Sequence, residues 1–231
     1  MSLLECNGLT KFFGNTIALD TFDLNLEEGK IVGLLGPNGS GKTTLIKLCN
    51  RLLQPSSGEL LIDGKVPSTE TKKMISYLPD RECLPNWMKI HELVNFYKDF
   101  FEDFDQDKAL KLLRDLDIPQ DMSLKKMSKG TKEKVQLVLT MSRNAKIYLL
   151  DEPLSGVDPA ARDYILKTII QNYSENSLVI ISTHLIADVE SILDEAVFIK
   201  DGKLLLHKPV DQIREETNKS VDEYFREVFS C

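Results

Sequence analysis

The sequence predicts an α/β fold with a mainly parallel sheet in its core, an N-terminal antiparallel β-subdomain and an inserted helical subdomain. Residues 31–35 form a short apolar run that ends at a glycine-rich turn, and residues 43–53 then have a helical pattern, which is the opening of a parallel α/β unit. Residues 147–150 and 178–182 have the composition of strands buried on both faces. Residues 81–146 are mainly helical in pattern and contain no convincing strand.

Four segments toward the edges of the core predict the antiparallel pairing. Residues 58–64 and 201–207 are apolar runs flanked by turn residues, and they resemble hairpin arms. Residues 3–9 and 18–26 are the candidates to pair with them. We therefore expect these segments to form antiparallel pairs beside the parallel strands.

The middle of the chain predicts the helical subdomain. Its helical pattern has breaks near Pro85, Pro119 and Ser123. We expect one domain over residues 1–231, in which residues 1–80 and 147–231 form the core with its β-subdomain and residues 81–146 form the helical subdomain.

Two later segments have helical spacing. Residues 159–173 lie between two of the predicted buried strands, and residues 221–229 read as a short amphipathic helix. The second helix has Tyr224, Phe225 and Val228 available for packing.

The composition is that of a packed protein, with 42% hydrophobic and 28% charged residues among 231 and a net charge of −7. A negative balance argues against a nucleic-acid partner, which would favour a basic face, so we expect none. Because no C-x-x-C pair is present, we expect neither a disulfide framework nor a zinc site, and a reducing cytosol is the simplest location. The cysteines are Cys6, Cys49, Cys83 and Cys231.

The chain has no basic stretch followed by an apolar core at its start, so we expect no signal peptide. Its longest apolar runs have the length of strands and are far short of the roughly 20 residues that a spanning helix needs. We therefore expect any membrane role to come through a separate partner.

The glycine-rich turn after residues 31–35 carries the most specific motif. Residues 36–43 (GPNGSGKT) match G-x-x-x-x-G-K-[ST], in which backbone N–H groups and a helix N-terminus wrap the phosphates of a nucleotide. We expect Lys42 to reach the β- and γ-phosphates of ATP and the Thr43 hydroxyl to ligate Mg²⁺. The predicted nucleotide-binding residues of this loop are Gly36, Pro37, Asn38, Gly39, Ser40, Gly41, Lys42, Thr43 and Thr44.

Three polar side chains follow the predicted buried strands directly, at the sheet edge where α/β folds bind ligands. Asp151 suits the coordination sphere of Mg²⁺, and Glu152 is placed to accept a proton from an attacking water. His184 is a candidate to bond the transferring phosphoryl group; the alternative is an ordinary structural histidine. The predicted catalytic residues are therefore Glu152, His184 and Lys42.

These pieces together resemble the ATP-binding subunits of ABC transporters, a family with a phosphate-loop (P-loop) NTPase core. The most specific element is residues 127–131 (MSKGT), which stand where the family has Leu-Ser-Gly-Gly-Gln. Residues 155–158 match the loop after the Asp-Glu pair, and residues 182–184 match the segment with the family's switch histidine. The resemblance covers essentially the whole chain.

The resemblance implies further nucleotide contacts. Ser128 and Gly130 would contact the γ-phosphate held by an opposite subunit, at the N-terminus of the following helix. Lys129 and Asp158 are further predicted nucleotide-binding residues. Phe13 matches the aromatic residue that stacks on adenine, with a core position as the alternative.

Three residues depart from the family pattern. The family usually has Gln where this chain has Asp80, which can still serve Mg²⁺ but cannot donate a hydrogen bond and adds a negative charge beside the phosphates. The alternative is that Asp80 points into solvent or pairs with a nearby cation such as Arg81. Lys129 replaces a glycine and adds a cation that either assists binding or stays solvated, and Thr131 replaces a glutamine.

The resemblance implies an ATPase that drives transport. Two cassettes, in a homodimer or a heterodimer, would close on two Mg²⁺–ATP and drive a membrane permease on a separate chain. The chain would then be cytoplasmic and peripheral on the inner face of the membrane. Its Ser-Lys-Gly signature and its tail resemble cassettes of bacterial drug and peptide exporters. The alternatives are a soluble ABC ATPase that acts on ribosomes or DNA, and a cassette that serves sensing or self-resistance.

Overall fold

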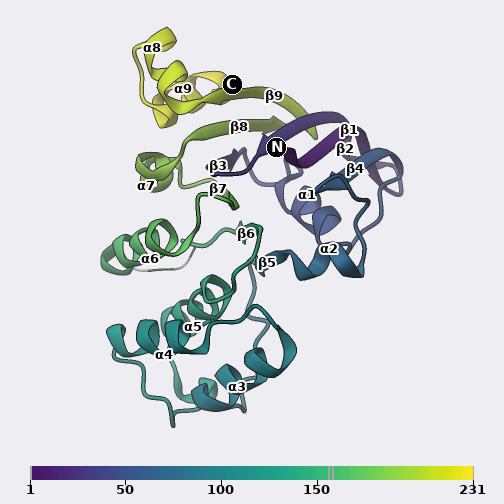
Figure 1. The fold of residues 1–231 in the computed structure, drawn as a ribbon. Coiled ribbons are helices and arrows are strands. Elements are labelled where there is room, and N and C mark those ends of the chain that lie inside the picture. The colour runs from purple at the N-terminus through teal and green to yellow at the C-terminus, as the bar shows by residue number, and fades with distance from the viewer. Residues whose placement is uncertain (1, 156, 158, 231) are drawn as a thin grey trace.

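The computed structural model describes residues 2–155, 157 and 159–230, and Figure 1 shows how its elements follow one another. The strands are β1 (Ser2–Phe13), β2 (Thr16–Glu27), β3 (Lys30–Leu35), β4 (Ser57–Ile62), β5 (Ile75–Leu78), β6 (Ile147–Asp151), β7 (Leu178–Thr183), β8 (Glu195–Lys200) and β9 (Lys203–Pro209). The helices are α1 (Lys42–Cys49), α2 (Thr69–Lys73), α3 (Ile90–Phe100), α4 (Gln106–Asp115), α5 (Lys129–Met141), α6 (Pro159–Asn172), α7 (Ile186–Val189), α8 (Val210–Thr217) and α9 (Val221–Phe229), with short 3-10 helices η1 (Leu124–Lys126) and η2 (Glu190–Ile192).

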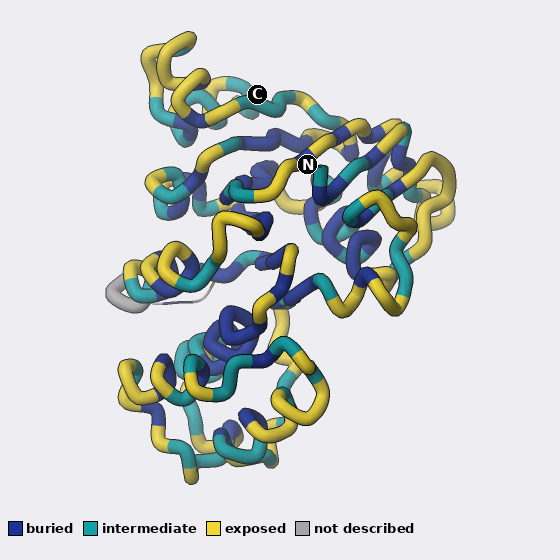
Figure 2. The backbone as a smooth tube through the Cα atoms, in the orientation of Figure 1, coloured by how far each residue is buried: buried dark blue, intermediate teal, exposed yellow. Residues whose placement is uncertain are grey.

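The central sheet has the strand order β5-β6-β7-β3-β8-β9 and is parallel except for its last strand. Every residue of β6 and β7 is buried, as expected for strands covered on both faces. Figure 2 shows this burial running through the middle of the molecule. The predicted α/β class and the predicted central strands are therefore confirmed.

A second sheet of order β2-β1-β4 is antiparallel throughout, which confirms the predicted β-subdomain. Residues 203–207 form a hairpin arm as predicted, but the suggested pairing with residues 3–9 or 18–26 was wrong, because β9 pairs with β8 in the central sheet. The reason is local: Asp201 and Gly202 have φ of 50° and 77° and form a tight turn that returns the chain onto β8. The turn contacts the β-subdomain at Asp20, whose N–H donates to the Gly202 carbonyl at 2.9 Å and whose carboxylate lies 3.1 Å from the Lys203 ammonium.

Helix α1 ends earlier than predicted, at Cys49 rather than at residue 53. Arg51 has a φ of 52°, a left-handed conformation that stops a helix. The N–H groups of Leu52 and Leu53 then bond back to the Lys47 carbonyl at 2.8 and 3.2 Å. The apolar pattern of the sequence continues through Leu52 and Leu53, but the left-handed conformation of Arg51 determines where the helix ends.

Helices α3, α4 and α5 share an apolar cluster of their own, separate from the two clusters that flank the central sheet. In Figure 1 they lie together at the end of the molecule away from β1 and β9. Helix α5 connects the two parts, because Val138 packs in the helical cluster while Leu137 and Met141 pack in the core. The division of the chain after residues 80 and 146 stays a prediction.

The predicted tail helix is confirmed as α9. Tyr224, Phe225 and Phe229 surround Phe198 of β8, with ring centroids 5.3 to 6.0 Å from that ring. Within the described residues, none of the helices combines the length and the apolar character needed to cross a membrane.

Candidate active site

The loop between β3 and α1 needs its glycines. Gly41 has a φ of 112°, and a Cβ added there would lie 2.5 Å from the Ala18 carbonyl oxygen. A Cβ at Gly36 would lie 2.4 Å from the Ile199 carbonyl oxygen. The turn before β9 braces the loop, because Gly202 N–H donates to the Ser40 carbonyl at 3.0 Å. The loop is thus packed against two strands in a conformation that larger residues cannot adopt.

Lys42 is buried at the first position of α1, with 6% of its side chain exposed. Its ammonium group donates to the carbonyls of Gly36 and Pro37 at 2.7 and 3.2 Å. It also lies 4.0 Å from Glu152 Oε1. Burial lowers the pKa of Lys42, while the charges of Glu152 and Asp151 act against that shift. The Lys42 ammonium group is therefore held by two carbonyls of the loop and lies near the Glu152 carboxylate.

Asp151 ends strand β6 and is almost completely buried. Its Oδ1 accepts hydrogen bonds from Thr43 Oγ1 at 3.2 Å and from Ser182 Oγ. Burial raises the pKa of Asp151; the hydroxyl hydrogen bonds oppose this shift, and the charges of Asp80 and Glu152 add to it. Its other oxygen, Oδ2, is buried and has no hydrogen-bond partner among the described residues. That oxygen is free to accept a bond from a water or to contact a cation.

The donors around Asp151 fit Mg²⁺, which prefers oxygen ligands and is usually held in nucleotide sites by one or two protein side chains together with phosphates and water. Thr43 supplies a hydroxyl oxygen, and Asp151 supplies a carboxylate with an unsatisfied oxygen. In the part of the chain that the structure describes, no group of three or more His, Cys, Asp or Glu side chains forms a metal site of another kind.

Glu152 follows Asp151 with a φ of 52°, an unusual conformation for a residue with a long side chain. Its backbone N–H is bonded to the Ser182 carbonyl at 2.9 Å, which holds this turn against β7. Its Oε2 lies 2.9 Å from His184 Nδ1 and accepts a bond from Thr183 Oγ1 at 3.3 Å. His184 is 45% exposed, so it is not a buried core histidine. The strained turn aims the Glu152 carboxylate between Lys42 and His184.

These side chains open into two neighbouring pockets. A pocket of about 220 Å³ is lined by residues 38–44 together with Asp80 and Glu152. A second pocket, of about 310 Å³, shares those two carboxylates and extends to Lys129 at the start of α5. The Asp80 carboxylate is 39% exposed and lies 3.9 Å from Arg81 Nε. Asp80 therefore lines the phosphate-loop pocket and contacts Arg81 at the same time, and its predicted role toward Mg²⁺ stays a prediction.

Ser128, Lys129, Gly130 and Phe13 are not among the described residues that line the phosphate-loop pocket. Ser128 is the N-cap of α5, where its hydroxyl accepts a bond from the Thr131 N–H at 3.2 Å. Lys129 is 3.7 Å from Glu133, and Gly130 follows in the first turn of the same helix.

Phe13 ends β1 and is 47% exposed, so the alternative of a core position is excluded. The Lys11 ammonium lies 5.2 Å from the centre of its ring. The predicted contact at Asp158 falls outside the described residues.

Ser182 and Thr183 have roles that were not predicted from the sequence: their hydroxyls donate hydrogen bonds to the carboxylates of Asp151 and Glu152. Ser182 is the register partner of Asp151 in the parallel pair β6–β7. The sequence did contain a signal for these contacts: two hydroxyl residues lie at the end of the predicted strand at residues 178–182, and two acidic residues follow the predicted strand at residues 147–150. Neighbouring parallel strands bring such ends together.

Comparisons with known proteins agree with this geometry. Residues 19–155 match the family described as ABC transporter. The ABC transporter ATP-binding protein YtrB of Bacillus subtilis is 30% identical, over 93% of this chain and 74% of that protein. The SkfA peptide export ATP-binding protein SkfE of the same species is 27% identical, over 94% of this chain and 93% of that protein. A solved structure of the ATP-binding subunit of an ABC transporter superposes with a TM-score of 0.88 at 25% identity, covering 98% of this chain and 99% of that one.

Proposed function

This chain belongs to the ABC transporter family and is an ATP-binding ATPase of that family; on that premise, we propose that it works as one of two cassettes that close on Mg²⁺–ATP and drive a separate membrane exporter. One observation carries the ATPase chemistry in this proposal. The phosphate loop, the Lys42 ammonium and the Glu152 carboxylate meet around one pocket of about 220 Å³.

The phosphates of ATP would be held by the loop amides and by Lys42. On binding, a phosphate oxygen would take the place of the Gly36 and Pro37 carbonyls as the acceptor of hydrogen bonds from Lys42. The new hydrogen bond would be stronger because the acceptor carries a negative charge. The negative charge of the phosphates would be offset by a bound Mg²⁺. Thr43 and Asp151 would hold it directly or through water, with Asp80 at its side. Phe13 supplies an exposed ring for the adenine base.

Glu152 would accept the proton of the attacking water. As the water oxygen bonds the γ-phosphorus, its proton moves to the carboxylate, and the bond from the γ-phosphorus to the bridging oxygen breaks to release ADP and phosphate. His184 would hydrogen-bond an oxygen of the transferring group. The contact between its Nδ1 and Glu152 orients the ring and leaves Nε2 available for that contact.

The second cassette would complete the site. Ser128 is not among the described residues that line the two pockets of its own chain. The start of α5 presents a helix N-terminus and the Lys129 cation, both of which attract an anion. We therefore assign Ser128, Lys129 and Gly130 to the γ-phosphate bound by the partner, in a homodimer or with a related cassette.

The permease would dock beside the helical part of the chain. A groove of about 370 Å³ runs between α2 and the end of α3, with aromatic rings and charges of both signs among its lining residues. Phe100 lies in this groove and is 68% exposed, and its ring stacks on Phe96, which is 49% exposed. Exposed aromatic rings in a groove are typical of protein interfaces. Docking here would place the chain on the inner face of the membrane.

We propose export because the relatives include SkfE, a peptide-export protein; the 30% identical L-cystine import protein TcyC of Bacillus subtilis makes import the alternative. The permease would select the transported molecule, so the class of substrate follows from that partner and not from this chain.

The hydrolysis step is tested with Glu152→Gln. The amide keeps the size of the side chain but accepts a proton poorly, so we expect ATP binding to persist and kcat to fall by about 10²–10⁴-fold. Glu59→Gln, on the exposed side of β4, is the matched control and should keep wild-type turnover. Near wild-type hydrolysis by Glu152→Gln would show that Glu152 is not the base.

The assembly is tested by purifying the tagged chain from detergent extracts of its native cells. We expect one polytopic membrane protein to copurify, and Phe100→Asp to reduce its recovery while ATPase activity of the free chain remains. Copurification with ribosomes in place of a membrane protein would overturn the transport proposal.

A further inference from the structure

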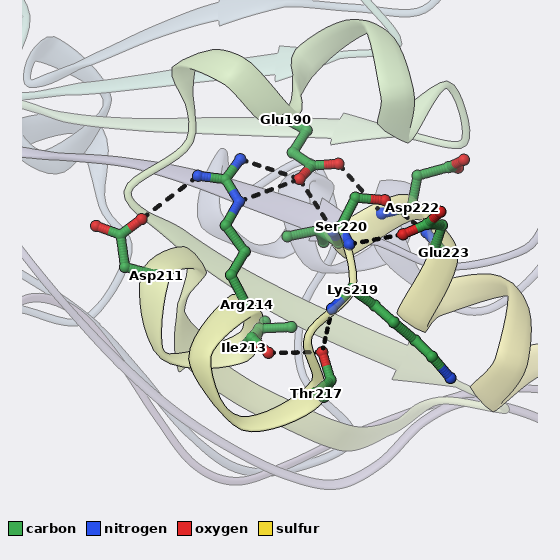
Figure 3. Close-up of polar contacts among 10 residues, drawn as sticks. Glu190, Asp211, Ile213, Arg214, Thr217, Lys219, Ser220, Asp222 and Glu223 are labelled. Carbon is green, nitrogen blue, oxygen red and sulfur yellow. Dashed lines mark hydrogen bonds and ion pairs between the residues drawn. The ribbon is translucent and has the colours of Figure 1, made fainter.

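Glu190 makes a set of contacts that the nucleotide site does not explain, shown in Figure 3. Its carboxylate is only 11% exposed and accepts bonds from Arg214 Nη2 at 3.0 Å and Arg214 Nε at 3.3 Å. It also accepts the backbone N–H groups of Val221 and Asp222 at 3.0 and 3.3 Å. One carboxylate near the core thus binds α8 through Arg214 and α9 through its first turn.

These contacts satisfy groups that a helix cannot satisfy by itself. The first N–H groups of a helix have no acceptor within it, and a negative charge there is favourable. In α9 the N–H of Glu223 is capped by Ser220 Oγ at 3.1 Å, so Glu190 supplies the acceptor for the two N–H groups before it. The start of α9 is therefore fixed to Glu190 and is not free to shift along the surface.

Glu190 itself lies six positions after His184. The short helix α7 connects them, Glu190 begins η2, and Ile186 and Val189 of α7 are buried in the core. At the start of this segment, Leu185 N–H donates to Thr183 Oγ1 at 3.0 Å, and that hydroxyl donates to Glu152. The segment from Thr183 to Glu190 is thus held at one end by the acidic pair and at the other end by the C-terminal helices.

The other side of α9 is fixed to the strand beside the phosphate loop. Phe225 meets Phe198 edge-on with ring centroids 5.3 Å apart. Phe198 is the register partner of Leu35, the residue directly before the loop. Helix α9 therefore contacts two elements near the site. One is β8, which pairs with the strand that leads into the phosphate loop, and the other is Glu190, at the end of the segment that begins at His184.

From this connection we infer that Glu190 is a positioning residue for hydrolysis, which acts through the α7–η2 segment to hold the His184 ring against Glu152. The inference rests on the proposed role of His184. Among the described residues, Glu190 is not part of the lining of either pocket at the phosphate loop, so we expect it to affect turnover far more than ATP binding.

The test compares Glu190→Gln with Asp211→Asn. Gln keeps the size of the side chain but removes its negative charge, which interacts with both Arg214 and the first turn of α9. Its NH₂ group would also face N–H donors and could not accept hydrogen bonds from them. Asp211 is the second partner of Arg214, at 3.4 Å and 89% exposed, and serves as the matched control. Arg214→Met is a milder variant, because it leaves the α9 cap in place.

We expect Glu190→Gln to lower kcat by about tenfold, the effect of losing a charge-assisted hydrogen bond, with KM for ATP within about twofold of wild type. Hydrogen exchange at the amides of residues 185–192 should rise by about the same factor and stay unchanged in Asp211→Asn. Arg214→Met should also lower kcat and raise hydrogen exchange at these amides, but by smaller factors than Glu190→Gln. The stoichiometry of ATP binding must stay at the wild-type value, which separates positioning from partial unfolding.

The inference and the proposed function fail in different ways. Wild-type turnover by His184→Ala would refute the role of His184 itself. A slow His184→Ala together with unchanged exchange and turnover in Glu190→Gln would refute the positioning role alone. A loss of ATP-binding stoichiometry in both Glu190→Gln and Arg214→Met would also refute it, because Glu190 would then support the fold and not the site.

Discussion

Arg143→Met should be among the most destabilising single substitutions in this protein. The Arg143 side chain is 4% exposed, and its guanidinium makes two bonds to Asp103, at 2.9 and 3.1 Å. It also donates to the carbonyls of Ile75 at 2.6 Å and Lys73 at 2.7 Å, and it lies 4.0 Å from the centre of the Phe101 ring. One buried cation thus joins the start of β5 and the end of α2 to the loop between α3 and α4.

Methionine keeps most of the apolar volume but leaves a carboxylate and two carbonyls without their donor. Breaking a buried ion pair in this way costs about 3–5 kcal/mol. For a domain of this size, a loss of about 1 kcal/mol lowers Tm by about 2–4 °C, so we expect a fall of about 10 °C. The free energy of unfolding in urea measures the same loss directly.

Two further variants test whether the loss of stability comes from the unpaired buried carboxylate. Arg226→Met removes an exposed ion pair with Asp222 and should cost less than about 1 kcal/mol. In the double variant Arg143→Met, Asp103→Leu the unpaired carboxylate is gone, so part of the loss should be recovered. A cost below about 1 kcal/mol for Arg143→Met, or no recovery in the double variant, would refute this account of the site.

Asp80→Gln should bind ATP without metal equally or up to about fivefold more tightly, because a partly screened like charge near the phosphates is removed. The Mg²⁺ dependence of its ATPase rate should shift, and superimposable Mg²⁺ titrations of variant and wild type would place Asp80 outside the metal site. Gly41→Ala should weaken ATP binding more than Gly39→Ala in a direct binding assay, because both positions have positive φ but only the first would place a Cβ against a backbone carbonyl; equal effects would contradict the packing described for the loop. Phe225→Ala should cost about 1–3 kcal/mol in urea unfolding, since its ring packs on both Phe198 and Phe229; a negligible cost would mean that α9 is only loosely attached.

The sequence predicted those features that depend on neighbouring residues in the chain. The phosphate loop is one continuous motif between a strand and a helix, and β6 and β7 are continuous apolar runs, so local pattern was enough to find them. The end of α1 depends on one left-handed residue, Arg51, and the partner of β9 depends on the turn at Gly202. Neither conformation leaves a distinct mark on the hydrophobic pattern.

Contacts between distant segments were harder to predict. The bond of Ser182 to Asp151 spans 31 positions and follows only from the strand order of the sheet. The bonds from Glu190 to α9 span 31 and 32 positions and join two helical ends whose relative placement depends on the packing around Phe198. A single sequence contains no period or spacing that pairs such residues.

The central claim, a site completed by two cassettes, is tested most directly by mixing two inactive variants. Lys42→Ala damages the phosphate loop and Ser128→Arg damages the start of α5, so each variant alone should form pairs in which both sites are damaged. In an equal mixture, half of the pairs would contain one intact site, and ATPase activity should return to about a quarter of the wild-type rate if pairs form at random. Full activity of either variant alone, or a mixture no more active than its components, would contradict the account.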